Sequence, residues 1–185
     1  KTSIVRCKKR KKQSFREGEE KKKKYVEKIN EMIQMQEVLD EAFLENALFM
    51  PSETDRTVAW LDELGEFTHE VKKSWCWWKH TQKDIDRQRA LEELVDMFHF
   101  AFGMWAVRSC EDFNQGEYQS IVRLVNEIVY KPDKALEMVI SISGEYSLLR
   151  RTLLIMLAYG FNIDEVHDEY MKKNKENYDR IARGY

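Results

Sequence analysis

The sequence predicts an all-α fold, arranged as a compact helical bundle. Only two prolines and seven glycines occur in 185 residues, so the residues that usually punctuate strands and turns are scarce. Leu, Glu, Lys, Met and Ala, which favour helix, dominate the composition. Apolar residues recur at helical spacing after residue 28. A chain of this length has room for one domain with a full core, and no composition break after residue 28 indicates a second.

We expect the protein to be intracellular, in a reducing compartment. Its longest mostly apolar run, near Leu148–Phe161, is too short and too charged to span a bilayer, and no signal peptide pattern precedes it. The three cysteines, Cys7, Cys76 and Cys110, lack CxxC spacing, which argues against a disulfide framework or a zinc site. We expect a cytoplasmic location, or a nuclear one if the source is eukaryotic.

Charge is divided unevenly along the chain. Residues 1–28 contain thirteen Lys or Arg and four Glu, whereas residues 29–185 contain eighteen Lys or Arg and twenty-nine Asp or Glu. Basic runs such as Lys21–Lys24 could touch nucleic acid or act as a localisation signal, but they are more often solvated. We expect residues 1–28 to be a flexible basic tail and residues 29–185 to form the single all-α domain.

A first helix is expected over Tyr25–Phe49, ended by Pro51. Its apolar stripe includes two polar residues, Gln36 and Asp40. A buried polar group without a partner costs about 1–3 kcal/mol, so each must meet another polar group or a ligand. A buried network between helices explains either residue alone equally well.

The second expected helix follows a capping signature at Ser52–Asp55 and continues to about Lys73. Glu63 lies on the flank of its core stripe, and Glu66 lies a little further round. An ExxE pair is a weak signal by itself, because a solvated acidic face is its usual explanation.

The third expected helix, about Asp86–Ser109, is apolar on every side and is therefore a buried helix. Glu93 and Asp96 interrupt one of its apolar faces. Two inward carboxylates must be protonated, ion-paired or bound to a metal. A metal is favoured over ion pairing because the other inward-leaning groups nearby, Glu63 and Glu66, are also acids.

The last helix presents donors to a shared target. It is expected over Ile163 to about Ala182, after helices near Tyr118–Tyr130, Pro132–Ser143 and Glu145–Tyr159 that look structural. Its inward face begins apolar and then becomes Lys173, Asn174, Asn177 and Arg180. Anionic oxygens are the natural target of Lys and Arg.

These groups together indicate metal-assisted phosphate chemistry. Paired carboxylates one turn apart on two packed helices offer hard oxygen ligands, which suit Mg²⁺ or Mn²⁺ better than zinc. A divalent metal between acidic and basic groups can bridge carboxylates to a polyphosphate and lower the pKa of a bound water.

The residues also resemble a known family. ELGE (Glu63–Glu66) followed by EELVD (Glu92–Asp96) indicates the all-α NTP pyrophosphohydrolase superfamily. MIQMQEVLDEAF (Met32–Phe43) resembles the QxxLN/D helix of the dimeric dUTP pyrophosphatases, and YMKKNKENYDRIARGY (Tyr170–Tyr185) resembles their closing motif. The resemblance covers about Ile29 to Tyr185 and leaves out the basic tail.

The resemblance implies a homodimeric, Mg²⁺-dependent enzyme that hydrolyses dUTP, with dUDP as a further substrate. Water would attack the α-phosphorus and release dUMP and diphosphate, which limits uracil incorporation into DNA. Two or more Mg²⁺ ions, or Mn²⁺ as a substitute, would be bound by the four acids, and Glu63 would also orient and deprotonate the water. The four implied metal ligands are Glu63, Glu66, Glu93 and Asp96.

The resemblance also implies roles in nucleotide binding. Gln36 would read the uracil edge with Trp78 near the base and Lys79 near phosphate, since WK in WCWWK resembles the family. Asp40 stands where several relatives carry Asn. The groups expected on phosphate or sugar oxygens are Lys173, Asn174, Asn177 and Arg180, with Tyr185 as a further binding residue.

Several alternatives remain at this point. A pyrophosphatase of another nucleotide such as dCTP is open, because neither acidic motif reads a base. A di-iron bundle is suggested by Glu66-x-x-His69 and Asp96-x-x-His99, and a nucleic-acid-binding module by the basic tail. We expect His69 and His99 to be packing or supporting groups, and Trp75 and Trp77 to lie in the core or at an interface.

Overall fold

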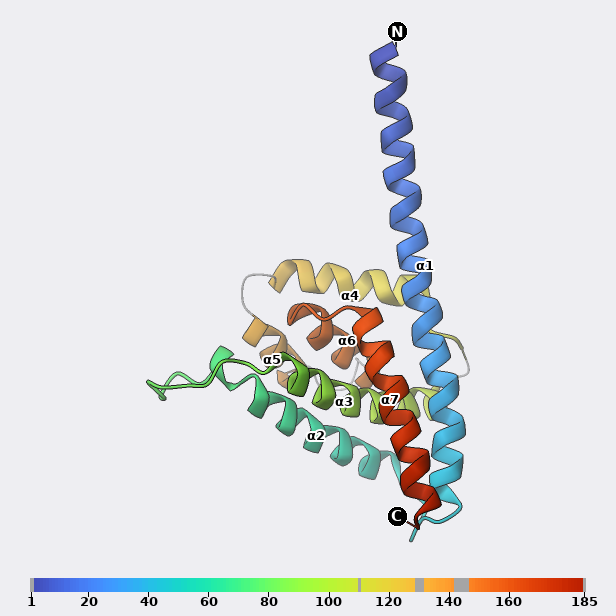
Figure 1. The fold of residues 1–185 in the computed structure, drawn as a ribbon, viewed down its shortest axis with the longest axis vertical. Helices are drawn as coiled ribbons and strands as arrows, with labels where there is room; N and C mark the ends of the chain where they lie inside the picture. Colours follow the sequence, from blue (N-terminus) through green and yellow to red (C-terminus); the bar gives the residue numbers. More distant parts are fainter. Residues whose placement is uncertain (1, 110, 129–131, 142–146, 185) are drawn as a thin grey trace.

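The computed structural model confirms the all-α prediction (Figure 1). It describes residues 2–109, 111–128, 132–141 and 147–184, with side chains described from residue 18 onward except at residues 128, 132 and 141. Within these ranges the chain forms seven α-helices and one 3-10 turn, and no strand. The elements are α1 (Thr2–Leu44), α2 (Glu53–Glu70), η1 (Lys72–Ser74), α3 (Arg87–Arg108), α4 (Gln115–Ile128), α5 (Pro132–Ser141), α6 (Leu148–Ala158) and α7 (Ile163–Ala182).

The first helix differs from the prediction at both ends. It begins at Thr2, not Tyr25, so the helix includes the basic segment, and Figure 1 shows its N-terminal part projecting from the bundle. Lys and Glu are good helix formers, and pairs such as Lys22–Glu19 (2.9 Å) offset some of the repulsion between lysines. The helix ends at Leu44, before the expected Phe49. That residues 1–28 are flexible in solution stays a prediction.

Side-chain caps set the start of four helices. Ser52 and Asp55 form a capping box at the start of α2, as the sequence predicts, and Asn162 forms a second one with Glu165 at the start of α7. Asp86 accepts from two backbone N–H groups at the start of α3. Ser147 caps α6, so this helix begins at Leu148; the expected start, Glu145, lies outside the described residues.

The core is built around α3, the helix that is apolar on every side. It packs against α1, α2, α6 and α7, while α4 and α5 cover α6. Eleven of its residues are buried, including Leu94, Phe98 and Phe102. The polar residues in the middle of α3 face neighbouring helices, so Glu93 meets α2 and Asp96 meets α7.

The side-by-side packing of α1 and α7 places their polar inward faces together (Figure 1). The buried hydroxyl of Tyr170 on α7 donates to the Met32 carbonyl (3.2 Å) and to Gln36 Oε1 (3.0 Å) on α1. Below this contact, α7 continues with its Lys and Asn residues toward the end of α1.

No helix in the described residues is long and apolar enough to cross a membrane.

Replacing Thr152 with Val should destabilise the fold by about 1–3 kcal/mol, because it leaves a buried donor unpaired. Thr152 Oγ1 accepts from Trp60 Nε1 (2.9 Å) and donates to the Leu148 carbonyl, and both side chains are buried. Thr57→Val is the matched control, since Thr57 makes the same bond to a carbonyl one turn earlier at an exposed site. Urea denaturation measures the free energy of unfolding, and we expect a larger loss for Thr152→Val than for Thr57→Val. Equal losses for the two variants would show that the Trp60 contact contributes nothing.

Candidate functional site

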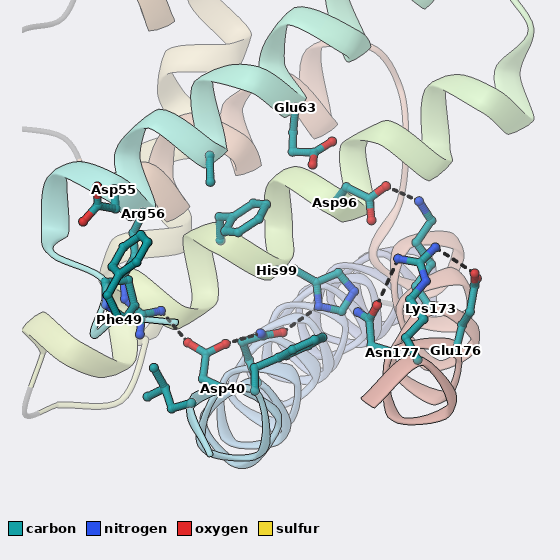
Figure 2. A pocket seen from close by; sticks show the side chains of 17 residues that line it. Asp40, Phe49, Asp55, Arg56, Glu63, Asp96, His99, Lys173, Glu176 and Asn177 are labelled. Atoms are coloured by element: carbon teal, nitrogen blue, oxygen red, sulfur yellow. Dashed lines mark hydrogen bonds and ion pairs between the residues drawn. The ribbon is translucent and has the colours of Figure 1, made fainter. Parts of the chain in front are cut away.

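The packing of α2 on α3 brings three carboxylates together. One oxygen from each of Glu63, Glu66 and Glu93 lies within 4.8 Å of the others. Glu66 is exposed and the other two are partly buried. Of the four predicted metal ligands, Asp96 stands apart from this group of three in the described residues, because it contacts Lys173 on α7 instead (Figure 2).

The like charges of this acidic cluster (Glu63, Glu66 and Glu93) disfavour ionisation. The pKa of Glu63 is raised to about 7, chiefly by burial and further by the charges of Asp96, Glu66 and Glu93, while Lys173 opposes the shift. Burial also raises the pKa of Glu93, while Lys173 opposes this shift. Hard oxygen ligands that repel one another fit a divalent cation, which would replace that repulsion by attraction.

Asp96 and Lys173 balance each other's charge across the gap between α3 and α7. Burial raises the pKa of the Asp96 carboxyl, and the hydrogen bond and charge of Lys173 work in the opposite direction. Both side chains are partly buried, with about a quarter of their surface exposed. The ion pair therefore connects the carboxylate helix to the donor helix.

The four predicted donors on α7 differ in burial, since Asn174 is buried, Lys173 and Asn177 are partly buried, and Arg180 is exposed. Lys173, Asn177 and Arg180 line a cavity, and Arg180 donates to Asn177 Oδ1 (3.4 Å) and Glu176 Oε1 (2.8 Å) (Figure 2). Asn174 is buried, and its Nδ2 has no hydrogen-bond partner among the described residues. Tyr185 lies outside the described residues.

The cavity has a volume of about 470 Å³ and lies where α1, α2, α3 and α7 meet (Figure 2). This volume is within the range of small-molecule sites. One part of its lining is charged, with Glu63 and Asp96 facing the cations of α7. The other part is mainly apolar and comprises Phe43, Leu44, Phe49, Pro51, Ala59 and Phe100.

A line of hydrogen bonds crosses the lining of the cavity from α2 to α3. Arg56 donates to Asp40 Oδ2 (2.5 Å), and Gln36 Nε2 donates to Asp40 Oδ1 (2.6 Å). Gln36 Oε1 lies 2.6 Å from Nδ1 of His99 (Figure 2). Each oxygen of Asp40 thus already accepts from a protein donor. Gln36 and Asp40 do point inward, and they partner each other.

Sequence reasoning missed one residue of this network, Arg56. His99 was expected to be a packing or supporting group; its side chain contacts Gln36 and lines the cavity, and its buried Nε2 has no partner among the described residues. Burial, together with the positive charges of Lys173 and Arg180, lowers its pKa to about 3, so it is neutral. Arg56 lies one turn before the core residue Trp60 and therefore on the same inward face of α2. This position in the sequence could have identified Arg56 as an inward-facing charge.

The histidines do not join the acidic cluster. His69 is exposed, and His99 faces Gln36. The group of three potential ligands in the described residues contains only carboxylates. Nothing in this arrangement therefore favours the di-iron alternative, which needs a histidine beside each carboxylate pair.

The tryptophan segment lies away from the cavity. Trp78 and Lys79 are exposed and do not line it, so their proposed contacts with a nucleotide stay predictions. Trp75 packs against the core, as expected, and its Nε1 donates to the Thr68 carbonyl (2.8 Å). Trp77 is 87% exposed in the single chain, so a core position is wrong for this residue, and its expected alternative position at an interface stays a prediction.

The comparison with known families agrees with the motifs. A family model described as dUTPase matches residues 28–185, which is most of the chain. This match confirms the resemblance inferred from the acidic motifs and the C-terminal motif. Comparisons with curated proteins and with solved structures gave no significant match.

Replacing Glu63 with Gln should raise the stability of the metal-free protein at alkaline pH. The folded-state pKa of Glu63 is about 7, above its ordinary value of 4.5, so the penalty of the ionised carboxylate appears above pH 4.5 and is complete above pH 7. Allowing for solvent screening at this half-exposed site, we expect a melting temperature about 2–4 °C higher at pH 8.

Thermal unfolding in the presence of EDTA measures this effect. At pH 5 the gain should be small, and the exposed neighbour Asp62, replaced with Asn, should give none at either pH. A lower melting temperature for Glu63→Gln at pH 8 would contradict the electrostatic account.

Proposed function

Because the chain belongs to the dUTPase family and is a dUTP pyrophosphohydrolase, we propose that it hydrolyses dUTP to dUMP and diphosphate by attack of water on the α-phosphorus. The observation that carries this mechanism is the cavity in which carboxylates of α2 and α3 face the cations of α7. The cellular role that follows is to limit uracil incorporation into DNA. Family membership implies a divalent metal, and we propose two or more Mg²⁺ ions, with Mn²⁺ as a substitute.

The acidic cluster fits these ions by the chemistry of its donors. Glu63, Glu66 and Glu93 would hold the metal, with Asp96 as a fourth ligand one turn along α3. When bound, Mg²⁺ neutralises the phosphates, polarises the phosphorus and lowers the pKa of water at the site. Glu63 lines the cavity as well as belonging to the cluster, so it is placed to orient the water and accept its proton.

The donor face of α7 would hold the triphosphate. Lys173 and Arg180 provide charge, and Asn177 an amide, where α7 lines the cavity. Lys173 pairs with Asp96 in the free protein, and in the complex each of the two would turn to an incoming partner, Lys173 to phosphate and Asp96 to metal. Asn174 is buried behind them, so we assign it to supporting this face or to the sugar.

The apolar part of the cavity would hold the base against Phe43 and Phe100, where Gln36 reads its edge. Both amide atoms of Gln36 are engaged by protein groups, but Nε2 keeps a second N–H. We also propose a homodimer, because Leu48, Phe49 and Met50 form an exposed apolar run beside the cavity.

Replacing Glu93 with Gln should lower kcat/KM for dUTP at least about 100-fold, because a metal ligand loses its charge. Diphosphate release in the presence of Mg²⁺ and a panel of nucleoside triphosphates measures activity, and circular dichroism checks the fold. Glu92→Gln, on the adjacent residue outside the cluster, should retain activity. Equal activity of the two variants would remove the metal role of Glu93, and no preference for dUTP in the panel would remove the proposed substrate.

Replacing Lys173 with Met should raise KM for dUTP roughly tenfold or more, because a charge-assisted contact with phosphate is lost. Steady-state kinetics at saturating Mg²⁺ measure the change. Lys175→Met is the matched control, since Lys175 is exposed on the same helix and does not line the cavity. An unchanged KM with Lys173→Met would show that this lysine does not contact substrate.

A further inference from the structure

The ion pair between Arg56 on α2 and Asp40 on α1 is built into the packing of three helices. A Cβ atom at Gly103 on α3 would lie 2.5 Å from Asp40 Oδ2 and 3.0 Å from the Arg56 guanidinium. The glycine therefore leaves the space that the ion pair fills. The Arg56 side chain is 14% exposed and the Asp40 side chain 20%, so this pair is held in one place by surrounding atoms.

The ion pair determines which way the amide of Gln36 faces. An ionised carboxylate only accepts hydrogen bonds, so Gln36 must direct Nε2, not Oε1, at Asp40 Oδ1 (2.6 Å). Its Oε1 then faces His99 Nδ1 (2.6 Å) and the Tyr170 hydroxyl (3.0 Å), and both must donate to it. The neutral imidazole of His99 consequently carries its proton on Nδ1 and a lone pair on Nε2.

The lone pair of His99 is available to a ligand. Its Nε2 is buried, has no partner among the described residues, and belongs to a side chain that lines the cavity. A buried acceptor without a partner costs free energy that a ligand donor would recover. Beside it, Gln36 keeps one N–H, so the cavity wall offers an acceptor next to a donor.

We propose that Arg56 and Asp40 are positioning residues that fix the direction of the hydrogen bonds through Gln36, so that His99 presents an acceptor and the site selects bases with an N–H donor. Uracil carries N3–H at its pairing edge, whereas cytosine carries a lone pair on N3. The lone pair of cytosine would oppose that of His99 Nε2. This inference rests on the proposed function for its ligand, but the direction of the network is a property of the free protein.

Replacing Asp40 with Asn should reverse the network without leaving any member unpaired. The carbonyl oxygen of the introduced amide would accept from Arg56, which turns the NH₂ group of that amide toward Gln36. Gln36 would then flip and present Oε1 to position 40 and Nε2 to His99 Nδ1. Tyr170 would accept from Gln36 while still donating to the Met32 carbonyl. His99 would carry its proton on Nε2 and present a donor to the cavity.

Long-range ¹H–¹⁵N correlation spectra of the nucleotide-free protein test the direction of the network. The wild-type protein should show His99 protonated on Nδ1, and Asp40→Asn should show it protonated on Nε2, with a His99→Asn variant to assign the signals. Arg56→Lys, which keeps the cation, should retain the wild-type form. Arg108→Gln, which breaks an exposed ion pair between α3 and Glu53 on α2, should also retain it.

Kinetics with dUTP and dCTP test the selectivity. The ratio of kcat/KM for dUTP to that for dCTP should fall at least about tenfold in Asp40→Asn. The reason is that the unfavourable contact with His99 Nε2 would then be made by uracil N3–H and no longer by the cytosine lone pair. The ratio should be unchanged in Arg108→Gln. A reversed imidazole with an unchanged ratio overturns the role in selectivity.

The spectra test the direction of the hydrogen bonds even in a protein that shows no hydrolysis of dUTP. A His99 protonated on Nε2 in the wild-type protein overturns the inference, and this measurement needs no folded variant. A protein that hydrolyses no dUTP refutes the proposed function, whereas its His99 signals still report whether Asp40 sets the direction. An imidazole that stays protonated on Nδ1 in a folded Asp40→Asn variant also overturns the inference.

Discussion

The packing of α3 against four other helices is the constraint on which the site depends. A helix with apolar residues on every side is stable only when it is covered, and its coverage forces Glu93 and Asp96 against α2 and α7. Charged groups in such a position must find partners. The chain supplies a lysine for one carboxylate and further acids for the other, so the same contact that forms the core also concentrates charge at its edge.

Much of the fold follows from local sequence signals. The capping residues and helical periodicity predicted the helices, and α7 has the predicted bounds because both its apolar face and its Asn162 cap are strong. The extension of α1 to Thr2 was not predicted, because a run of lysines was read as solvated chain. Helical pairing with glutamates such as Glu19 and Glu27 provides a local compensation that charge counting overlooks.

The sequence was sufficient to predict which types of residue form the site, but it predicted fewer of the contacts between them. The helical positions of Glu63, Glu66 and Glu93 were sufficient to predict that they would meet, although Glu66 is exposed and only the other two are partly buried. The partnership of Arg56 with Asp40 was not, because these residues meet through the space above Gly103, a tertiary detail with no periodic signal. The exposed positions of Trp78 and Lys79 likewise depend on an irregular segment between η1 and α3, for which sequence periodicity provides no information.

The ion pair between Asp96 and Lys173 has a consequence for how a charged ligand enters. If metal and triphosphate bind as proposed, the carboxylate exchanges an ammonium for a metal ion, and the ammonium exchanges a carboxylate for phosphate. In this exchange, neither the Asp96 carboxylate nor the Lys173 ammonium would have to lose one partner of opposite charge before it meets the next. Lys173 would then serve as a resident counter-ion that keeps the charge of the cavity balanced between one turnover and the next.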